Sequence, residues 1–182
     1  MELEISIIGF GNIGKTIATL LLPFKEINFN INIIDNDAST IGAILDLKHG
    51  AQLHNNHQIS YNSNDLLNKS DFIFHCAGAS VPIGKSRLVT CQESIEITEK
   101  IFNNFSPIKE PFIIVVTNPV EIISLITQKI TGLPKKNIIG TGTLLDSIRM
   151  NYIIKQTKPN LNSIQTIILG EHGKTAFLSQ QL

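Results

Sequence analysis

Three glycines and one aspartate near the N-terminus have the types and spacing of a nucleotide-binding site. Gly9, Gly11 and Gly14 form the pattern Gly-x-Gly-x-x-Gly directly after an apolar run at residues 5–8. In a dinucleotide site the first glycine makes a tight turn, the second lets the backbone approach a pyrophosphate, and the third lets a helix lie close to the strand. The next apolar run ends in Asp35, where a carboxylate would bind the adenosine ribose 2′-hydroxyl and repel the extra phosphate of NADP. We therefore expect NAD as the cofactor, held by Gly9, Gly11, Asn12, Ile13, Gly14 and Asp35.

The same glycine-rich stretch also fits the phosphate loop of nucleoside triphosphatases, because Lys15 and Thr16 follow the third glycine. In that interpretation Lys15 reaches the β- and γ-phosphates and Thr16 holds magnesium, so a second apolar strand ending in a metal-binding aspartate should follow. The run at residues 112–116 is instead followed by a threonine, Asn118 and a proline, and Asp71 precedes its apolar run rather than ending it. The dinucleotide site is favoured, and a P-loop nucleotide hydrolase is the weaker alternative.

The composition of the chain bounds the classes of partner. Its 182 residues are 42% hydrophobic and carry 15 basic and 15 acidic side chains, so no charge bias points to nucleic acid. No apolar run approaches the roughly 18 residues of a membrane span, and no signal sequence is evident. The two cysteines, Cys76 and Cys91, have no metal-binding spacing and are expected to be buried. We expect a cytoplasmic protein with small-molecule ligands, no metal, no nucleic-acid partner and no membrane partner.

Short apolar runs alternate with segments of helical period along the whole chain, which predicts an α/β fold. The expected strands are residues 4–8, 30–34, 58–61, 72–76, 112–116 and 137–139. The expected helices are residues 13–22, 38–49, 87–105, 120–130 and 143–157. This alternation predicts a Rossmann-type, doubly wound parallel sheet, in which ligands bind outside the carboxyl ends of the strands.

The loop at residues 77–88 follows the fourth expected strand and has the glycine-bearing composition of a lid. Arg87 is its one arginine, and from this loop alone it could equally be a solvated residue in the first turn of the next helix.

Five segments, taken together and in this order, resemble the NAD-dependent L-lactate and malate dehydrogenase family. They are Gly9-Phe-Gly-Asn-Ile-Gly14 with Asp35; Leu45-Asp-Leu-Lys-His-Gly50; Cys76-Ala-Gly-Ala79 with Gly84-Lys-Ser-Arg-Leu88; Val116-Thr-Asn-Pro-Val120; and Gly140-Thr-Gly-Thr-Leu-Leu-Asp-Ser-Ile-Arg149 leading to Gly170-Glu-His-Gly173. The resemblance spans essentially the whole chain. Within the family, residues 141–150 look most similar to the branched-chain, or 2-hydroxyisocaproate, dehydrogenases.

The resemblance implies hydride transfer between NAD and a small L-2-hydroxy acid or 2-oxo acid. His172 resembles the family's general acid and base, and Asp146 would hold its ring in one tautomer. Arg149 would clamp the substrate carboxylate, and Arg87 would arrive with the lid to stabilise charge on the carbonyl oxygen. Asn118 would bind the substrate oxygen or the cofactor. Gly78 and Ala79 complete the expected cofactor site.

Three positions depart from the family's pattern and bear on the substrate. Val81 stands where lactate dehydrogenases carry glutamine and malate dehydrogenases carry arginine, Ser94 replaces a common asparagine, and Lys174 replaces an aspartate or small polar residue. Val81 cannot pair with the second carboxylate of oxaloacetate, so it predicts a preference for 2-oxo acids with aliphatic tails.

The chain ends ten residues after His172, whereas the family has a longer second half. We therefore expect an NAD-binding domain at residues 1–140 and only the start of a substrate domain at residues 141–182, with residues 175–182 unpaired and loosely ordered. A truncated NAD-binding module without turnover is the alternative to an active dehydrogenase. The full-length parent would be a homo-oligomer, as the resemblance implies.

Overall fold

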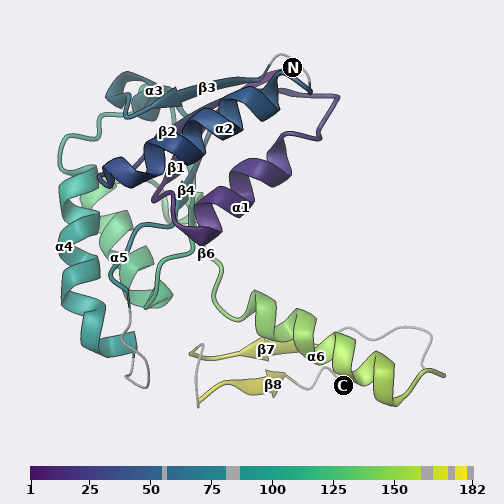
Figure 1. Cartoon of the computed structure of the whole chain (residues 1–182). Coiled ribbons are helices and arrows are strands. Elements are labelled where there is room, and N and C mark those ends of the chain that lie inside the picture. The colour runs from purple at the N-terminus through teal and green to yellow at the C-terminus, as the bar shows by residue number, and fades with distance from the viewer. Residues whose placement is uncertain (55–56, 81–86, 161–165, 172–174, 180–182) are drawn as a thin grey trace. The chain divides into compact units, whose positions relative to one another are not determined.

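The computed structural model describes residues 1–54, 57–80, 87–160, 166–171 and 175–179 (Figure 1). The chain divides into two compact units, Met1–Gly140 and Thr141–Leu182.

Six strands among the described residues form one parallel sheet in the first unit, in the order β3-β2-β1-β4-β5-β6. The strands are β1 (Glu2–Ile8), β2 (Asn28–Ile34), β3 (Gln58–Tyr61), β4 (Phe72–His75), β5 (Phe112–Val115) and β6 (Ile138–Gly140). This is the strand order of the dinucleotide-binding Rossmann fold, so the predicted fold class is confirmed. The order reverses between β1 and β4, which places a ligand crevice at the carboxyl ends of these two strands.

The helices of the first unit follow the strands that they connect. They are α1 (Asn12–Leu21), α2 (Ile41–Ala51), α3 (Asn64–Lys69), α4 (Cys91–Phe102) and α5 (Val120–Thr131), with 3₁₀ turns at Ala38–Thr40, Arg87–Thr90 and Lys135–Asn137. The single helix predicted at residues 87–105 is thus a 3₁₀ turn followed by a shorter α-helix. The short helix α3 was not predicted. No helix among the described residues is long and apolar enough to cross a lipid bilayer.

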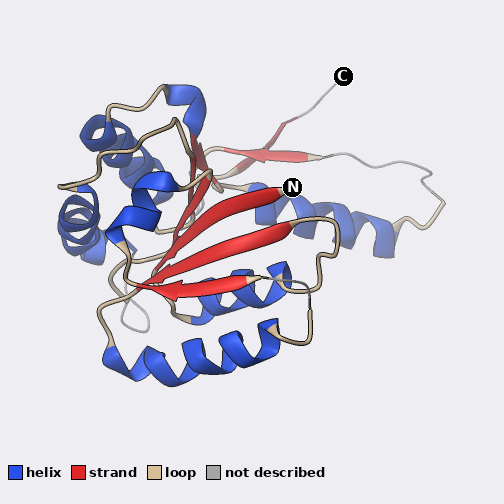
Figure 2. Ribbon diagram, turned by 90° about the horizontal axis from the view of Figure 1, so that it is seen from above, coloured by secondary structure: helices blue, strands red, loops and turns tan. Residues whose placement is uncertain are grey.

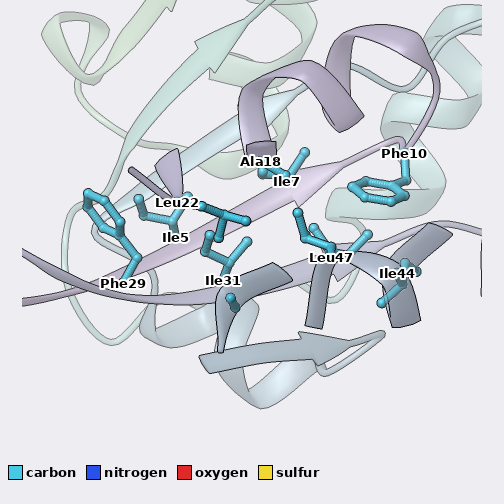
Figure 3. Close-up of a cluster of buried hydrophobic side chains, with 11 residues drawn as sticks. Ile5, Ile7, Phe10, Ala18, Leu22, Phe29, Ile31, Ile44 and Leu47 are labelled. Carbon is cyan, nitrogen blue, oxygen red and sulfur yellow. The ribbon is translucent and has the colours of Figure 1, made fainter. Parts of the chain in front are cut away.

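Helices cover both faces of the sheet (Figure 2). Alternate residues of a strand point to opposite faces of its sheet. On one face the β1 side chains Ile5 and Ile7 pack with residues of β2, α1 and α2 in a single buried cluster (Figure 3). This cluster consists of Ile5, Ile7, Phe10, Ala18, Leu22, Phe29, Ile31, Ile33, Ile44, Leu47 and Ala51. The spacing of Gly14 and Ala18, the two buried residues of α1, puts the helix backbone close to the strands.

The opposite face carries a second buried cluster that includes residues of α3, α4 and α5. Its members are Ile8, Leu67, Ile73, Phe102, Ile113, Val115, Val120, Ile123 and Leu133. Two buried polar residues, Ser6 and Asn32, interrupt the apolar surface of β1 and β2 on this face. They are satisfied internally, because Asn32 Nδ2 donates to Ser6 Oγ and to the Ser63 carbonyl oxygen, and the Ser6 and Ser70 hydroxyls bond each other at 2.8 Å.

The second unit consists of α6 (Leu144–Thr157) and an antiparallel pair, β7 (Ile167–Leu169) and β8 (Phe177–Ser179). Side chains of α6 hold β7: Ser147 Oγ accepts from the Ile168 N–H at 2.9 Å, and Asn151 Oδ1 accepts from the Thr166 N–H at 2.8 Å. The expectation that residues 175–182 are unpaired was wrong, because Phe177–Ser179 forms a strand. Alternation over three residues is too short a signal to predict a strand from the sequence.

Candidate functional site

The turn between β1 and α1 leaves no space for side chains at two of its three glycines. Gly9 has φ +88°, and its N–H donates to the Ile34 carbonyl oxygen at 2.8 Å. A Cβ on Gly9 would lie 2.6 Å from the Ala77 nitrogen, and a Cβ on Gly14 would lie 2.1 Å from the Gly9 carbonyl oxygen. These two glycines therefore let the turn pass close to the end of β4 and let α1 start directly on that turn.

Gly11 differs, because a Cβ there would meet no atom within 4 Å. It is the N-cap of α1 and provides no capping side chain, and the first turn of the helix has no acidic residue. The first N–H groups of a helix have no partner within the helix, and the helix dipole makes this end positive. The turn therefore offers backbone N–H donors to an anion that approaches at Gly11.

Asp35 follows β2 and is fixed by hydrogen bonds to its side chain and its backbone. Its carboxylate accepts from the Phe10 N–H at 2.5 Å and from the Asp37 N–H at 2.7 Å. Its backbone N–H donates to Asn62 Oδ1 at 2.9 Å, and its carbonyl oxygen accepts from Asn62 Nδ2 at 2.9 Å and from the Tyr61 hydroxyl at 3.1 Å. The two carboxylate oxygens together have more acceptor positions than these two N–H groups use, so Asp35 can still bind a ribose hydroxyl.

Asn62 is a site-forming residue that the sequence analysis missed. It has φ +50°, a left-handed conformation that asparagine tolerates better than most residues, and its amide bonds both backbone groups of Asp35. The sequence feature that could have indicated this role is the position of Asn62 directly after the third predicted strand, at the same edge of the sheet as Asp35.

A cavity of about 200 Å³ lies at the carboxyl ends of β4 and β5 and beside the start of α1. It is lined by Ile13, Cys76, Gly78, Ala79, Val116, Thr117 and Asn118. Four of these, Ile13, Gly78, Ala79 and Asn118, were predicted as cofactor-binding residues from the sequence, and the structure brings them together around one hollow. The other three, Cys76, Val116 and Thr117, were not predicted as cofactor-binding residues, although they adjoin predicted ones in the chain.

The wall of the cavity is shaped by Gly78, Thr117 and Ser94. A Cβ on Gly78 would lie 2.4 Å from Thr117 Cγ2, so only glycine fits beside this threonine. Thr117 Oγ1 donates to the Ala77 carbonyl oxygen at 2.8 Å, and the buried Ser94 Oγ of α4 accepts from the Ala79 N–H at 3.1 Å. Ser94, which departs from the common asparagine, thus holds the loop after β4 in place.

Cys76 and Cys91 are only partly buried, so the expectation that both are buried was wrong. Burial still raises the pKa of the Cys76 thiol to about 12, which keeps the sulfur neutral at physiological pH. A neutral thiol is a poor nucleophile and a poor metal ligand, so Cys76 contributes shape rather than reactivity to the cavity.

The side chain expected to hold magnesium in a P-loop is engaged elsewhere. The Thr16 hydroxyl donates to the Asn12 carbonyl oxygen within α1 at 2.8 Å. Within the described part of the chain, no group of three or more His, Cys, Asp or Glu side chains could hold a metal ion. The hydrogen bond of Thr16 within its own helix favours the dinucleotide interpretation over a magnesium-bound triphosphate.

Two buried histidines serve the core of the first unit. His57 Nδ1 accepts from the Phe29 N–H at 3.0 Å, so its Nε2 donates to the Leu22 carbonyl oxygen at 3.0 Å. His75 Nε2 bonds Thr98 Oγ1 at 2.9 Å, and burial lowers the pKa of His75 to about 4. The low pKa keeps the His75 ring neutral at physiological pH, and both rings are structural groups of the core.

Among the predicted catalytic residues, Asp146 and Arg149 lie in α6, where Arg149 Nη1 is 3.5 Å from Asp146 Oδ1. Their spacing of three residues puts both on one side of the helix, with Arg149 exposed and Asp146 half-buried. Arg87 begins the 3₁₀ turn before α4. Val81, His172 and Lys174 lie outside the described residues.

Comparison with known proteins settles the family. Residues 3–140 match the NAD-binding domain of lactate/malate dehydrogenases. The chain belongs to the lactate/malate dehydrogenase family. The resemblance found in the sequence is therefore confirmed, and NAD is the cofactor of the domain that residues 3–140 form.

Individual members of the family show the same similarity. The L-lactate dehydrogenase of Clostridium botulinum (strain 657 / Type Ba4) is 35% identical over 173 residues, which are 93% of this chain and 54% of that protein. The minor L-lactate dehydrogenase of Enterococcus mundtii superposes with a TM-score of 0.82 at 26% identity, over 96% of this chain and 57% of that one. The malate dehydrogenase of Aeropyrum pernix superposes with a TM-score of 0.81 at 28% identity, over 96% of this chain and 58% of that one. The chain thus spans about half the length of the curated relatives that it matches.

Proposed function

We propose that this chain binds NAD at the carboxyl edge of its sheet and serves an L-2-hydroxy acid dehydrogenase. The observation that carries the proposal is the turn between β1 and α1, where Gly9 and Gly14 are required by packing while Gly11 leaves the helix N-terminus open. An open N-terminus beside a fixed acidic residue suits a dinucleotide, because it provides donors for the pyrophosphate and an acceptor for the ribose.

The residues that would hold NAD follow four strands of the sheet, β1, β2, β4 and β5. The first N–H groups of α1, at Asn12 and Ile13, would bind the pyrophosphate. Asp35 would accept from the adenosine ribose, and Asn118 with the loop at Gly78 would line the nicotinamide end of the cavity. NAD, when bound, supplies or accepts a hydride at its nicotinamide ring.

Four residues would supply the acid–base and substrate-binding groups. His172 would give a proton to the alkoxide formed by a 2-oxo acid, and Asp146 would orient its ring. Arg149 would bind the substrate carboxylate with its planar guanidinium, and Arg87 would stabilise charge on the reacting oxygen. These roles rest on the match of each residue to the family's motifs.

The substrate that fits best is a 2-oxo acid with an aliphatic side chain. Val81 offers methyl groups where oxaloacetate would need a cation for its second carboxylate. Each methylene buried in such a pocket contributes roughly 1 kcal/mol, which is about fivefold in kcat/KM. We expect 2-oxoisocaproate to be preferred over pyruvate, and oxaloacetate to be the poorest of the three. We also propose that the full-length protein acts in the cytoplasm as a homo-oligomer.

A second candidate function is an NAD-binding module without turnover, which is favoured by the match of residues 3–140 to an NAD-binding domain. Titration of NADH into the chain, followed by nicotinamide fluorescence, tests the binding that both candidates share. A steady-state assay with NADH and the three acids then separates them. Binding without oxidation of NADH supports the module. NADH oxidation that is lost in His172→Asn supports the dehydrogenase.

The assigned cofactor residue can be tested on the same chain. Asp35→Ala should weaken NADH binding and narrow the preference for NADH over NADPH, because the ribose loses its acceptor and the extra phosphate loses its repulsion. If the preference is unchanged, Asp35 does not face the ribose.

A further inference from the structure

The dinucleotide interpretation gives no role to Lys15, which directly follows the third glycine of the stretch. It lies in the first turn of α1, where its N–H donates to the Gly11 carbonyl oxygen at 3.0 Å. Its side chain is exposed, with Nζ 6.0 Å from the centroid of the Phe10 ring. Lys15 forms no salt bridge with any described residue. A solvent-exposed cation about 6 Å from an aromatic ring gains only about 0.5–1 kcal/mol, so this contact leaves the ammonium free to meet an anion.

The charge of Lys15 acts on the acidic residues that follow β2. The Phe10 ring lies under its ammonium group, and the Phe10 N–H donates to Asp35. The second carboxylate is Asp37, whose N–H donates to Asp35 Oδ1. Hydrogen bonds from Ser39 lower the pKa of Asp37, and the charge of Lys15 lowers it further. Lys15 thus acts on the end of β2 through space without a direct ion pair.

We infer that Lys15 is a second determinant of selectivity between NADH and NADPH, opposing Asp35. This inference rests on the proposed function, because it takes the adenosine ribose to lie at Asp35. A 2′-phosphate there would carry close to two negative charges beside the carboxylate and within reach of a long, unpaired lysine side chain. Asp35 dominates because it contacts the ribose hydroxyl directly, whereas Lys15 reduces the penalty for the phosphate.

The experiment is a double-mutant cycle on the chain with Asp35→Ala and Lys15→Gln. Glutamine keeps much of the length of lysine and removes its charge. Dissociation constants for NADH and NADPH are measured for all four proteins by nicotinamide fluorescence. In the Asp35→Ala background, we expect Lys15→Gln to weaken NADPH binding by roughly fivefold more than NADH binding. This is the size of effect expected for one solvent-exposed ion pair between an ammonium group and a doubly charged phosphate. Lys15→Arg should keep the NADPH affinity.

A matched control is Lys129→Gln, because Lys129 is an exposed lysine on α5. It should leave the ratio of the two dissociation constants unchanged. An equal effect of Lys15→Gln and Lys129→Gln on this ratio would overturn the inference while leaving the proposed function intact. Failure of the unmodified chain and of Asp35→Ala to bind either dinucleotide would overturn both. Circular dichroism of each variant establishes that the comparison is made between folded proteins.

Discussion

The substitution Gly14→Ala tests whether the glycine turn is a packing requirement of the fold. The added Cβ would lie 2.1 Å from the Gly9 carbonyl oxygen and 3.3 Å from Ile7 Cγ2. Because the obstacle is backbone, α1 must move by about 1 Å to restore an ordinary contact, and strain of this kind costs about 1–3 kcal/mol. The higher helix propensity of alanine returns about 1 kcal/mol. The difference is a net loss of about 0–2 kcal/mol in the free energy of unfolding, and we expect the upper end, about 2 kcal/mol, because the atoms in the way are backbone.

A matched substitution in the same turn, Gly11→Ala, should separate packing from ligand binding. Its Cβ would meet no atom within 4 Å, and its φ of −71° with ψ of −163° suits alanine. The cost in stability should stay below about 1 kcal/mol, because alanine is a poorer N-cap than glycine. The methyl group would, however, occupy the approach of the pyrophosphate to the backbone, so NADH affinity should fall about tenfold or more.

Urea unfolding followed by circular dichroism measures the first effect, and NADH fluorescence titration measures the second. Gly14→Ala should lower both stability and affinity, since displacement of α1 moves the N–H donors. Gly11→Ala should lower affinity with little change in stability. An unfolding midpoint of Gly14→Ala equal to that of the unmodified chain would refute the packing argument. Unchanged NADH affinity in Gly11→Ala would refute the approach of phosphate at this glycine.

Four further predictions concern other residues of the chain. Asn62→Gly keeps the left-handed backbone accessible but removes both bonds to Asp35, so we expect NADH affinity to fall about fivefold in the same titration. Burial lowers the pKa of His75 from the ordinary 6.5 to about 4 in the folded chain. Between pH 6.5 and pH 4, the unfolded chain therefore carries a proton on His75 that the folded chain does not. Stability should therefore fall by up to about 3 kcal/mol as pH decreases from 6.5 to 4, and urea unfolding of His75→Gln should lack this component. In a dehydrogenase assay, Arg149→Lys should lose most activity because an ammonium cannot form two parallel bonds to a carboxylate. His172→Asn should lose activity and retain NADH affinity, whereas equal loss of both would indicate a structural role.

The sequence predicted the sheet because its strands are short, isoleucine-rich runs bounded by turn residues. The bounds shifted where pairing extends a strand: β1 begins at Glu2 and β2 at Asn28 because these two residues pair with each other. Helix α3 was missed because six residues carry no clear helical period, although Ser63 accepts from the Leu66 N–H as an N-cap. The β7 and β8 strands were missed because their pairing depends on contacts across a loop.

The candidate site was predictable where spacing alone defines chemistry and was hidden where it depends on contacts between distant segments. The glycines and Asp35 follow from a linear pattern. The hydrogen bonds that fix the site do not follow from such a pattern. Asn62, which bonds Asp35, lies 27 positions beyond it, and Ser94, which bonds Ala79, lies 15 positions beyond it. Hydrogen bonds of this kind require the register of parallel strands, which the sequence pattern does not specify.

The glycines of this fold carry two different kinds of information, and only one kind concerns the ligand. Gly9, Gly14 and Gly78 are needed because backbone or a neighbouring side chain occupies the space of a Cβ. A protein with the same fold and no cofactor would need them for the same reason. Gly11 has open space around it, so packing gives no reason for a glycine there, whereas close approach of a phosphate does. The absence of contacts at Gly11 is therefore stronger support for a dinucleotide site than the close contacts at the other three glycines.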